Sequence, residues 1–263
     1  HLDTVPNGGK YDGMLGVVAP VTLMAMFSGE GRQFPFHIDI VGFCDEEGTR
    51  FGTTLLGSRA LTGKWQDEWR RLKDEDGISL EDAMKNFGLD FDAINSATIA
   101  QTDLLGYLEL HIEQGPVLEQ ENLPVGVVNA IAGAKRFSLT VTGMAGHAGT
   151  VPMSMRHDAL CASAEMILAV ESISQQRPGV VATVGKIENA PNGVNVISGR
   201  CQFSLDIRSE EDPLRDAALA EILQKINDIA VLRNVELKIE QTHSAPAVHC
   251  DSALQNTLLK GVT

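Results

Sequence analysis

Cysteine is scarce in this chain, and its few copies lie far apart. The four residues, Cys44, Cys161, Cys201 and Cys250, form no C-x-x-C pair. The sequence therefore indicates neither a disulfide framework nor a zinc site built from thiolates. Isolated, reduced cysteines of this kind are typical of the cytoplasm, which is the location we expect.

Long apolar runs and an excess of basic residues are also missing. No run of about 18 apolar residues and no signal peptide is recognisable, so we expect no membrane span. Lysine and arginine number 21 against 35 aspartates and glutamates, which gives a net charge of −14. This balance argues against nucleic acids and anionic membranes as partners. A small anionic substrate is not excluded, because it needs only a local arginine.

What is present fits an ordinary globular protein. The 263 residues are 43% hydrophobic and 21% charged, enough for one large or two modest domains. In the first part, apolar residues 16–28 predict a buried helix, and β-branched residues favour strands over 36–43 and 106–112. The first strand ends just before an acidic cluster at 45–47, and the second ends near His111. Chemically active groups at strand ends are typical of an α/β sheet.

The later part of the chain has the pattern of a ferredoxin-like sandwich. The expected order is β-α-β-β-α-β, with strands at 136–142, 180–187, 200–207 and 235–239 and helices at 159–173 and 213–232. The last helix is the clearest element, because its apolar residues recur at spacings of three and four. We predict a catalytic domain over 1–130, an inserted lid and dimerisation domain over 131–245, and a return to the catalytic domain over 246–263.

Three clusters in the first part carry the chemistry of a metal site. They are His1-Leu2-Asp3 with Asp12-Gly13, then Glu46-Glu47-Gly48, then His111. Imidazoles and carboxylates bind divalent transition metals, and a bridging carboxylate allows two ions to bind side by side. We expect two ions bridged by Asp12. His1 and His111 would bind the first ion, and Glu47 the second.

Two further carboxylates have expected supporting roles. Glu46 and Glu47 should point in opposite directions where a strand ends, which leaves Glu46 free to take a proton from water. Asp3 is placed in the sequence to accept the second N–H of the His1 imidazole. Each cluster alone has an ordinary interpretation, as a surface His-x-Asp, a solvated acidic turn or a core histidine. Their combination favours the metal site.

The sequence resembles a known enzyme family at several motifs. In the first part these are His1-Leu2-Asp3-Thr4-Val5, Asp12-Gly13, Glu46-Glu47-Gly48 and His111-Ile112-Glu113-Gln114-Gly115-Pro116. In the later part they are Gly146-His147-Ala148-Gly149-Thr150, Asn195-Val196-Ile197 and Asp206-Ile207-Arg208. The pattern resembles the M20-type metallo-aminohydrolases, and among them the allantoate amidohydrolases and N-carbamoyl-L-amino-acid hydrolases. His111 is the sharpest marker, because peptidases of the wider family tend to have a carboxylate there.

The resemblance implies a fold and a role for each of these residues. The fold would be a zinc-peptidase-like α/β/α catalytic domain with an inserted ferredoxin-like lid, through which the protein forms a homodimer. Two ions of Zn, Mn, Co or Ni would bind to four ligands, which are His1, Asp12, Glu47 and His111. The catalytic groups would be Glu46 as general base and His147 as donor to the tetrahedral oxyanion. Three residues would contact the substrate, namely Gln114, Asn195 and, on its carboxylate, Arg208.

In two respects the sequence departs from the family: it lacks the last metal ligand, and it lacks the strands that precede the first ligand. The family's last metal ligand is a histidine in a Gly-His-Asp motif, and nothing in this sequence matches it. His243 and His249 lie where the family has no ligand, so we expect both to be ordinary residues. The first ligand is also the first residue. We therefore expect an internal part of a longer protein, with an incomplete second metal site and weak or absent activity in isolation.

The predicted function is metal-dependent hydrolysis of linear amidine or ureido C–N bonds. Allantoate is the first expected substrate and an N-carbamoyl-L-amino acid the second, since both present a carboxylate and a ureido group. Two alternatives stay open. An aminoacylase or dipeptidase of the wider family is disfavoured by His111. An inactive dimerisation module would fit a chain in which the inserted domain is whole.

Overall fold

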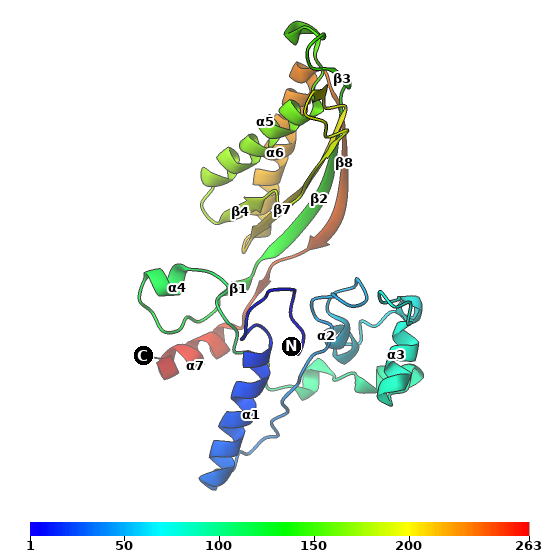
Figure 1. Ribbon diagram of the computed structural model, residues 1–263. Helices are drawn as coiled ribbons and strands as arrows, with labels where there is room; N and C mark the ends of the chain where they lie inside the picture. The colour runs from blue at the N-terminus through cyan, green and yellow to red at the C-terminus, as the bar shows by residue number, and fades with distance from the viewer. Residues whose placement is uncertain (263) are drawn as a thin grey trace. The chain divides into compact units, whose positions relative to one another are not determined.

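The computed structural model describes residues 1–262 of the chain (Figure 1). The chain divides into two compact units, His1–Pro124 and Val125–Thr263. Helices and strands together make a mixed α/β protein, which confirms the predicted fold class. The finer boundaries at 130 and 245, and the return to the catalytic domain after 245, stay a prediction.

The first unit contains no strand, and its helices between residues 56 and 97 surround a small core of aromatic residues and leucines. Its elements, with η for a 3-10 helix, are α1 (Met14–Gly29), α2 (Leu56–Leu61), η1 (Asp67–Arg71), α3 (Leu80–Phe87), η2 (Phe91–Ala97), η3 (Gln101–Asp103) and α4 (Val117–Gln120). The buried core consists of Phe51, Leu56, Trp69, Leu80 and Phe91. The ring of Trp69 lies edge-on to that of Trp65, with centroids 5.0 Å apart, a favoured arrangement of aromatic pairs.

Helix α1 forms where the sequence predicts a helix, but the predicted burial is wrong. None of its side chains is buried within the described part of the chain, and Val18, Val21 and Met26 are more than half exposed. An apolar sequence leads to burial only where another element packs over the helix. In this unit α1 therefore contributes to the site through its N-terminus, which directly follows Asp12 and Gly13.

The two strands predicted in the first unit, over 36–43 and 106–112, are not formed. No strand is assigned anywhere between His1 and Pro124. The segments do approach each other and the chain start: Leu2 N donates to Phe43 O at 2.7 Å, and the rings of Phe43 and Tyr107 lie 6.5 Å apart. A strand needs a repeated hydrogen-bond ladder, which one bond does not supply. The β-branched residues thus indicate where these segments meet, but not their secondary structure.

The second unit contains a ferredoxin-like sheet with helices α5 (Ala159–Gln175) and α6 (Asp212–Arg233) on one face (Figure 1). The antiparallel order is β4-β7-β2-β8, made of β2 (Gly133–Thr142), β4 (Val180–Thr183), β7 (Arg200–Ser209) and β8 (Glu236–Ala245). This order confirms the predicted sandwich. The single strand expected over 180–187 is instead two, since β5 (Ile187–Ala190) pairs separately with β7.

Shorter elements complete the second unit. Strand β1 (Ala130–Ile131) pairs with β9 (Val248–His249), and β3 (Gly146–His147) pairs with β6 (Val196–Ile197). The remaining elements are η4 (Met153–Met155) and α7 (Ser252–Val262).

The core of the second unit lies between the sheet and its two helices. On β7 the side chains of Phe203, Leu205 and Ile207 are buried against the helices, at the alternate positions that share one face of a strand. On α6 the inward face carries Ile222 and Ile226, both fully buried. Burial of each such side chain contributes about 1.5–3 kcal/mol. The opposite face of the sheet is left open and carries the polar residues of the alternation.

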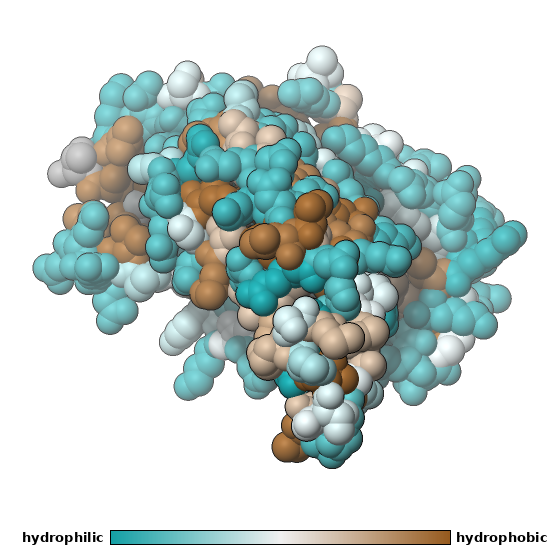
Figure 2. Space-filling view, turned by 90° about the horizontal axis from the view of Figure 1, so that it is seen from above, coloured by the Kyte–Doolittle hydropathy of each residue, from teal (hydrophilic) through white to brown (hydrophobic). Residues whose placement is uncertain are grey.

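The surface carries both hydrophilic and hydrophobic side chains. Figure 2 shows one face, on which separate hydrophobic patches lie among hydrophilic side chains. Large hydrophobic side chains such as Phe87 and Leu105 are exposed. Among residues 1–262, no helix combines the length and the apolar character needed to cross a membrane.

Candidate active site

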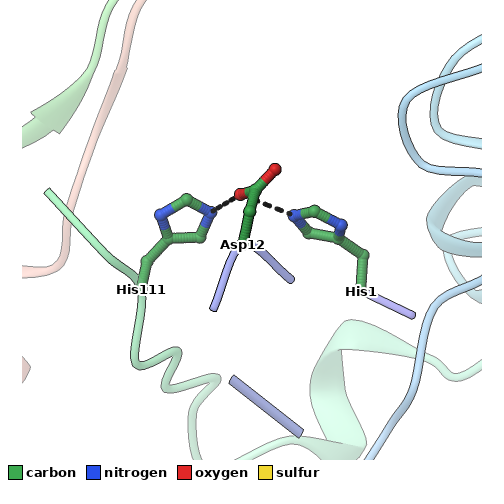
Figure 3. Close-up of side chains that lie close together, drawn as sticks. All are labelled: His1, Asp12 and His111. Atoms are coloured by element: carbon green, nitrogen blue, oxygen red, sulfur yellow. Dashed lines mark ion pairs between the residues drawn. The ribbon is translucent and has the colours of Figure 1, made fainter. Parts of the chain in front are cut away.

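Two histidines and an aspartate meet at the start of the first unit (Figure 3). Oδ1 of Asp12 lies 3.9 Å from Nε2 of His1 and 3.9 Å from Nε2 of His111. His1 and Asp12 are buried, with 8% and 2% of their surface exposed. A separation of 3.9 Å is too long for a hydrogen bond. The three atoms therefore face one another without bonding directly.

Backbone carbonyls fix the orientation of both imidazoles. Nδ1 of His1 lies 2.7 Å from the carbonyl oxygen of Asp3, and Nδ1 of His111 lies 2.7 Å from that of Ile112. Because a carbonyl oxygen can only accept, Nδ1 carries the proton and donates in both cases. In a neutral ring, Nε2 then presents its lone pair on the side that faces Asp12. Supporting hydrogen bonds orient metal-binding histidines in this way.

The carboxylate of Asp12 is held by two polar side chains. Oγ1 of Thr4 donates to its Oδ2 at 2.7 Å, and Nε2 of Gln114 donates to its Oδ1 at 3.0 Å. The next residue, Gly13, has a φ of 74°, and a Cβ there would lie 2.5 Å from Nδ1 of His1. Only glycine fits this position. The family resemblance implies a substrate contact for Gln114, but in this structure its amide N–H donates to Asp12.

The acidic cluster forms a turn, and its two glutamates converge. One ligand atom each of His1, Glu46 and Glu47 lies within 4.8 Å of the other two. The expectation that Glu46 and Glu47 point apart is therefore wrong. It assumed the alternation of a strand, and no strand is present here.

Asp3 also has a different partner from the one expected. Its carbonyl, not its carboxylate, accepts from the His1 imidazole. The carboxylate instead accepts the backbone N–H groups of Glu46 and Glu47, each at 3.0 Å. These partners are more than forty positions away in the sequence, so a His-x-Asp pattern alone does not reveal them.

Burial and like charges shift the acidity of the turn. The pKa of Glu46 is raised by burial first, and then by the negative charges of Glu47 and Asp3. The pKa of Glu47 is raised by burial, Asp12 and Asp3. Both carboxyl groups therefore hold a proton more readily than exposed glutamates do.

The donor set fits a divalent transition metal. Imidazole nitrogen and carboxylate oxygen bind such ions at about 2.0–2.2 Å, so two donors 3.9 Å apart are close enough to share one ion. His1 and Asp12 with His111 form one possible ligand group, and His1 with Glu46 and Glu47 forms another. The two groups share His1.

In the second unit, His147 and Asn195 are brought together by the short pair β3 and β6. His147 pairs with Val196 in this ladder, and Ala148 N donates to the carbonyl of Asn195 at 3.0 Å. Gly149 N donates to Nδ1 of His147 at 3.0 Å. Because Nδ1 accepts, the proton of the neutral ring is on Nε2. His147 thus has an N–H donor available for a ligand.

Arg208 lies on the open face of the sheet and pairs with Asp206. Its Nε donates to Oδ1 at 2.7 Å and a terminal nitrogen donates to Oδ2 at 3.0 Å. Arg136, opposite Asp206 on β2, donates to Oδ2 at 2.7 Å. The pKa of Asp206 is lowered mainly by the Arg208 hydrogen bond, and also by Arg136. The three side chains line an open groove of about 620 Å³, next to a register shift between β2 and β8.

Arg208 does not lie near His147 and Asn195 within this unit. Along the β2–β7 ladder, Arg208 is opposite Ala134, whereas Arg200 is opposite Thr142 at the other end. Figure 1 shows β3 beyond that other end, away from β1. The predicted lid residues therefore form two separate groups.

Residues 1–262 match the family described as Peptidase family M20/M25/M40. This chain belongs to the M20 family. Members are generally metal-dependent, and the two ligand groups above could hold a metal ion.

Relatives of this M20 chain are amidohydrolases and deiminases, which act on C–N bonds other than peptide bonds. It is 40% identical over 262 residues to an N-carbamoyl-L-amino-acid amidohydrolase of Pseudomonas sp. (strain NS671), covering 98% of this chain and 63% of that one. It is 37% identical over 281 residues to allantoate deiminase 2 of Glycine max, covering 98% and 58%. A solved hydantoinase/carbamoylase family amidase from Burkholderia ambifaria superposes with a TM-score of 0.89 at 32% identity, covering 99% and 64%. The M20 chain thus spans about three-fifths of the length of these relatives.

Two contacts of this M20 chain are absent from the sequence prediction. Thr4 supports Asp12, and its place directly after His-x-Asp is the only sequence signal for it. Arg136 shares Asp206 with Arg208. Strand alternation could have placed Arg136 on the open face, but not opposite Asp206, because register depends on the fold.

Proposed function

We propose that this M20 protein is a metal-dependent hydrolase of linear amidine or ureido C–N bonds in small substrates that carry a carboxylate. The convergence of His1, Asp12 and His111, with two glutamates beside His1, carries the proposal. Relatives named as N-carbamoyl-L-amino-acid amidohydrolases and allantoate deiminases support the same class of reaction. A cytoplasmic location and the absence of nucleic-acid partners remain predictions from composition.

The proposed cofactor is a pair of divalent ions, Zn, Mn, Co or Ni. His1, His111 and Asp12 would hold the first ion, and Asp12 and Glu47 would contribute to the second. When bound, such ions polarise the scissile group and acidify water. The carbonyl contacts of both imidazoles would keep Nε2 directed at the ion.

Glu46 is the proposed proton carrier. It would take a proton from the attacking water and return it to the leaving nitrogen. Its raised pKa, caused by burial and by Glu47 and Asp3, favours the protonated form needed between these two steps. Ammonia is a product and, for ureido substrates, carbon dioxide as well.

Three residues of the second unit are proposed to bind the substrate. Nε2–H of His147 would donate to the tetrahedral oxyanion, and Asn195 is its neighbour across the β3–β6 pair. Arg208 would bind the substrate carboxylate, and its pairing with Asp206 leaves further guanidinium N–H groups for that contact. In the first unit, Gln114 can still accept a ureido N–H with its carbonyl oxygen while it donates to Asp12.

We also propose a homodimer in which the two lid groups come from different copies. One small substrate cannot reach both Arg208 and His147 of the same lid, since they lie at opposite ends of the sheet. A second copy would bring its His147 and Asn195 to the site that uses the first copy's Arg208.

The test is turnover of allantoate and of N-carbamoyl-L-amino acids by metal-loaded protein, followed as ammonia release. We expect chelation to abolish it and Glu46→Gln to lower kcat by about 10²–10⁴-fold. Sequence identity to the allantoate deiminase is 37% and to the N-carbamoyl-L-amino-acid amidohydrolase 40%, which favours neither substrate clearly. The ratio of the two kcat/KM values therefore decides between the substrates. Hydrolysis of N-acetyl amino acids or dipeptides, with neither ureido substrate turned over, would contradict the proposal. An inactive dimer would instead support the dimerisation module.

A further inference from the structure

One residue, Asp3, contacts both segments of the proposed metal centre. Its carbonyl accepts from Nδ1 of His1 at 2.7 Å. Its carboxylate accepts from the backbone N–H of Glu46 and of Glu47 at 3.0 Å each, one oxygen to each N–H. The orientation of His1 is thus set by the backbone, while the side chain holds the acidic turn.

The backbone of that turn requires such support. Asp45 has a φ of 48°, a left-handed conformation that few residues other than glycine adopt. Gly48 has a φ of 66°, and a Cβ there would lie 2.7 Å from the carbonyl carbon of Thr53. Two successive N–H groups directed to one side form a concave anion-binding site. The Asp3 carboxylate occupies it.

Electrostatics alone would disfavour this arrangement. Asp3 places a negative charge beside two other carboxylates, those of Glu46 and Glu47. Like charges at close range repel each other. Hydrogen bonds from two N–H groups to an ionised carboxylate offset that cost, since bonds to a charged group are stronger than bonds between neutral groups. The contact is therefore specific to the backbone of the turn.

We propose that Asp3 is the positioning residue of the Glu46–Glu47 turn: its carboxylate fixes the backbone that directs both glutamates toward His1. Only the expected effect of Asp3 on turnover rests on the proposed function; the structural role of Asp3 does not. The predicted structural effect is local. Loss of the carboxylate should loosen the turn and leave the His1–Asp12–His111 group in place, because the carbonyl partner of His1 is kept.

The experiment compares Asp3→Ala, Asp3→Asn and wild type by amide hydrogen exchange and by Zn²⁺ titration calorimetry. In Asp3→Ala, the Glu46 and Glu47 amides should exchange about 10-fold faster or more, as expected from loss of a charge-assisted bond. Asp3→Asn keeps one acceptor oxygen and should protect one of the two amides. The Gly52 amide, bonded to the Gly48 carbonyl, reports whether the whole region unfolds. Asp39→Ala is the matched control, because Asp39 is exposed and takes no part in the contacts of Asp3 with His1, Glu46 and Glu47.

Two results separate this role from the alternatives. Zn²⁺ affinity of the His1–Asp12–His111 group should fall less than 10-fold in Asp3→Ala, whereas loss of a carboxylate that supported the His1 ring directly would lower it about 10–100-fold. The proposal would be overturned if Asp3→Ala left amide exchange at Glu46 and Glu47 unchanged and lowered Zn²⁺ affinity by about 10–100-fold. In turnover, kcat should fall with KM nearly unchanged, and Asp3→Asn should recover part of kcat. If wild type hydrolyses neither ureido substrate, the proposed function fails while the exchange result still decides the role of Asp3.

Discussion

Two predicted substrate-binding residues, Arg208 and His147, lie far apart in the second unit, and a complementation experiment can test what this separation implies. Arg208 and Arg200 are eight positions apart on β7, and Arg200 marks the end of the ladder beyond which β3 lies. At about 3.4 Å per residue, the two ends are about 27 Å apart. A ureido carboxylate spans only a few bonds. If Arg208 and His147 both act on one molecule, they must come from different copies of the chain.

The perturbation is a mixture of two inactive variants, His147→Ala and Arg208→Ala. In a symmetric dimer each site would take Arg208 from one copy and His147 from the other. A mixed dimer then has one site with both residues intact and one with neither. Random mixing in equal amounts gives half mixed dimers, so activity should return to about a quarter of wild type.

The assay is ammonia release after co-expression or subunit exchange, with two controls. His147→Ala mixed with Asn195→Ala should not recover activity, because these two neighbours come from the same lid. The second control mixes wild type in equal amounts with the double variant that carries both His147→Ala and Arg208→Ala. This mixture should retain about a quarter of full activity if His147 and Arg208 act between copies, but about half if they act within one copy. The reasoning would be refuted if the mixture of His147→Ala and Arg208→Ala recovered no activity and the mixture of wild type with the double variant retained half of full activity.

Three further predictions concern the folded state. In Asp206→Asn, the free energy of unfolding should fall less on acidification than in wild type. Arg208 lowers the pKa of Asp206 in the folded state. The ionised carboxylate therefore stabilises the fold fully above its unfolded pKa of about 3.9, and this stabilisation is lost as pH falls through the folded pKa. Urea unfolding at neutral and acid pH measures this change in unfolding free energy, and an equal change in variant and wild type would contradict the prediction. Burial and Glu109 raise the pKa of Tyr107 to about 12, so the ultraviolet difference between wild type and Tyr107→Phe should titrate near that value; a midpoint near 10 would exclude it. Leu139→Ala should cost about 2–5 kcal/mol of unfolding free energy, because Leu139 is fully buried. Leu168→Ala, which alters a leucine that is 64% exposed, should change it by less than about 0.5 kcal/mol.

The second unit is the part of the fold that the sequence predicts best, for a physical reason. Its strands alternate apolar and polar residues, and its second helix repeats apolar residues at helical spacing, so each element indicates its own buried face. The first unit gives weaker signals. Apolar residues of α1 predict burial that no described element provides, and the segments 36–43 and 106–112 meet without forming a ladder.

The candidate site shows the same limit at the level of single residues. The motifs bring His1, Asp12 and His111 into one prediction, and the structure places them together. The hydrogen-bond partners were not predictable. Asp3 reaches a turn more than forty positions away, and Arg136 and Asp206 are seventy positions apart. Such partners depend on the register and path of the chain, which residue types alone do not encode.

The charge balance of the first unit explains why a second imidazole, rather than another carboxylate, suits position 111. The charges of Asp3 and Glu47 raise the pKa of Glu46, and those of Asp12 and Asp3 raise the pKa of Glu47. Among residues 1–262, no lysine or arginine forms an ion pair with any of these four carboxylates. Hydrogen bonds from Thr4, Gln114 and backbone N–H groups satisfy part of this negative charge. A fifth carboxylate would add repulsion, whereas a neutral imidazole adds a ligand atom without adding charge. The imbalance is the kind that a bound divalent cation would neutralise, as the proposed function requires.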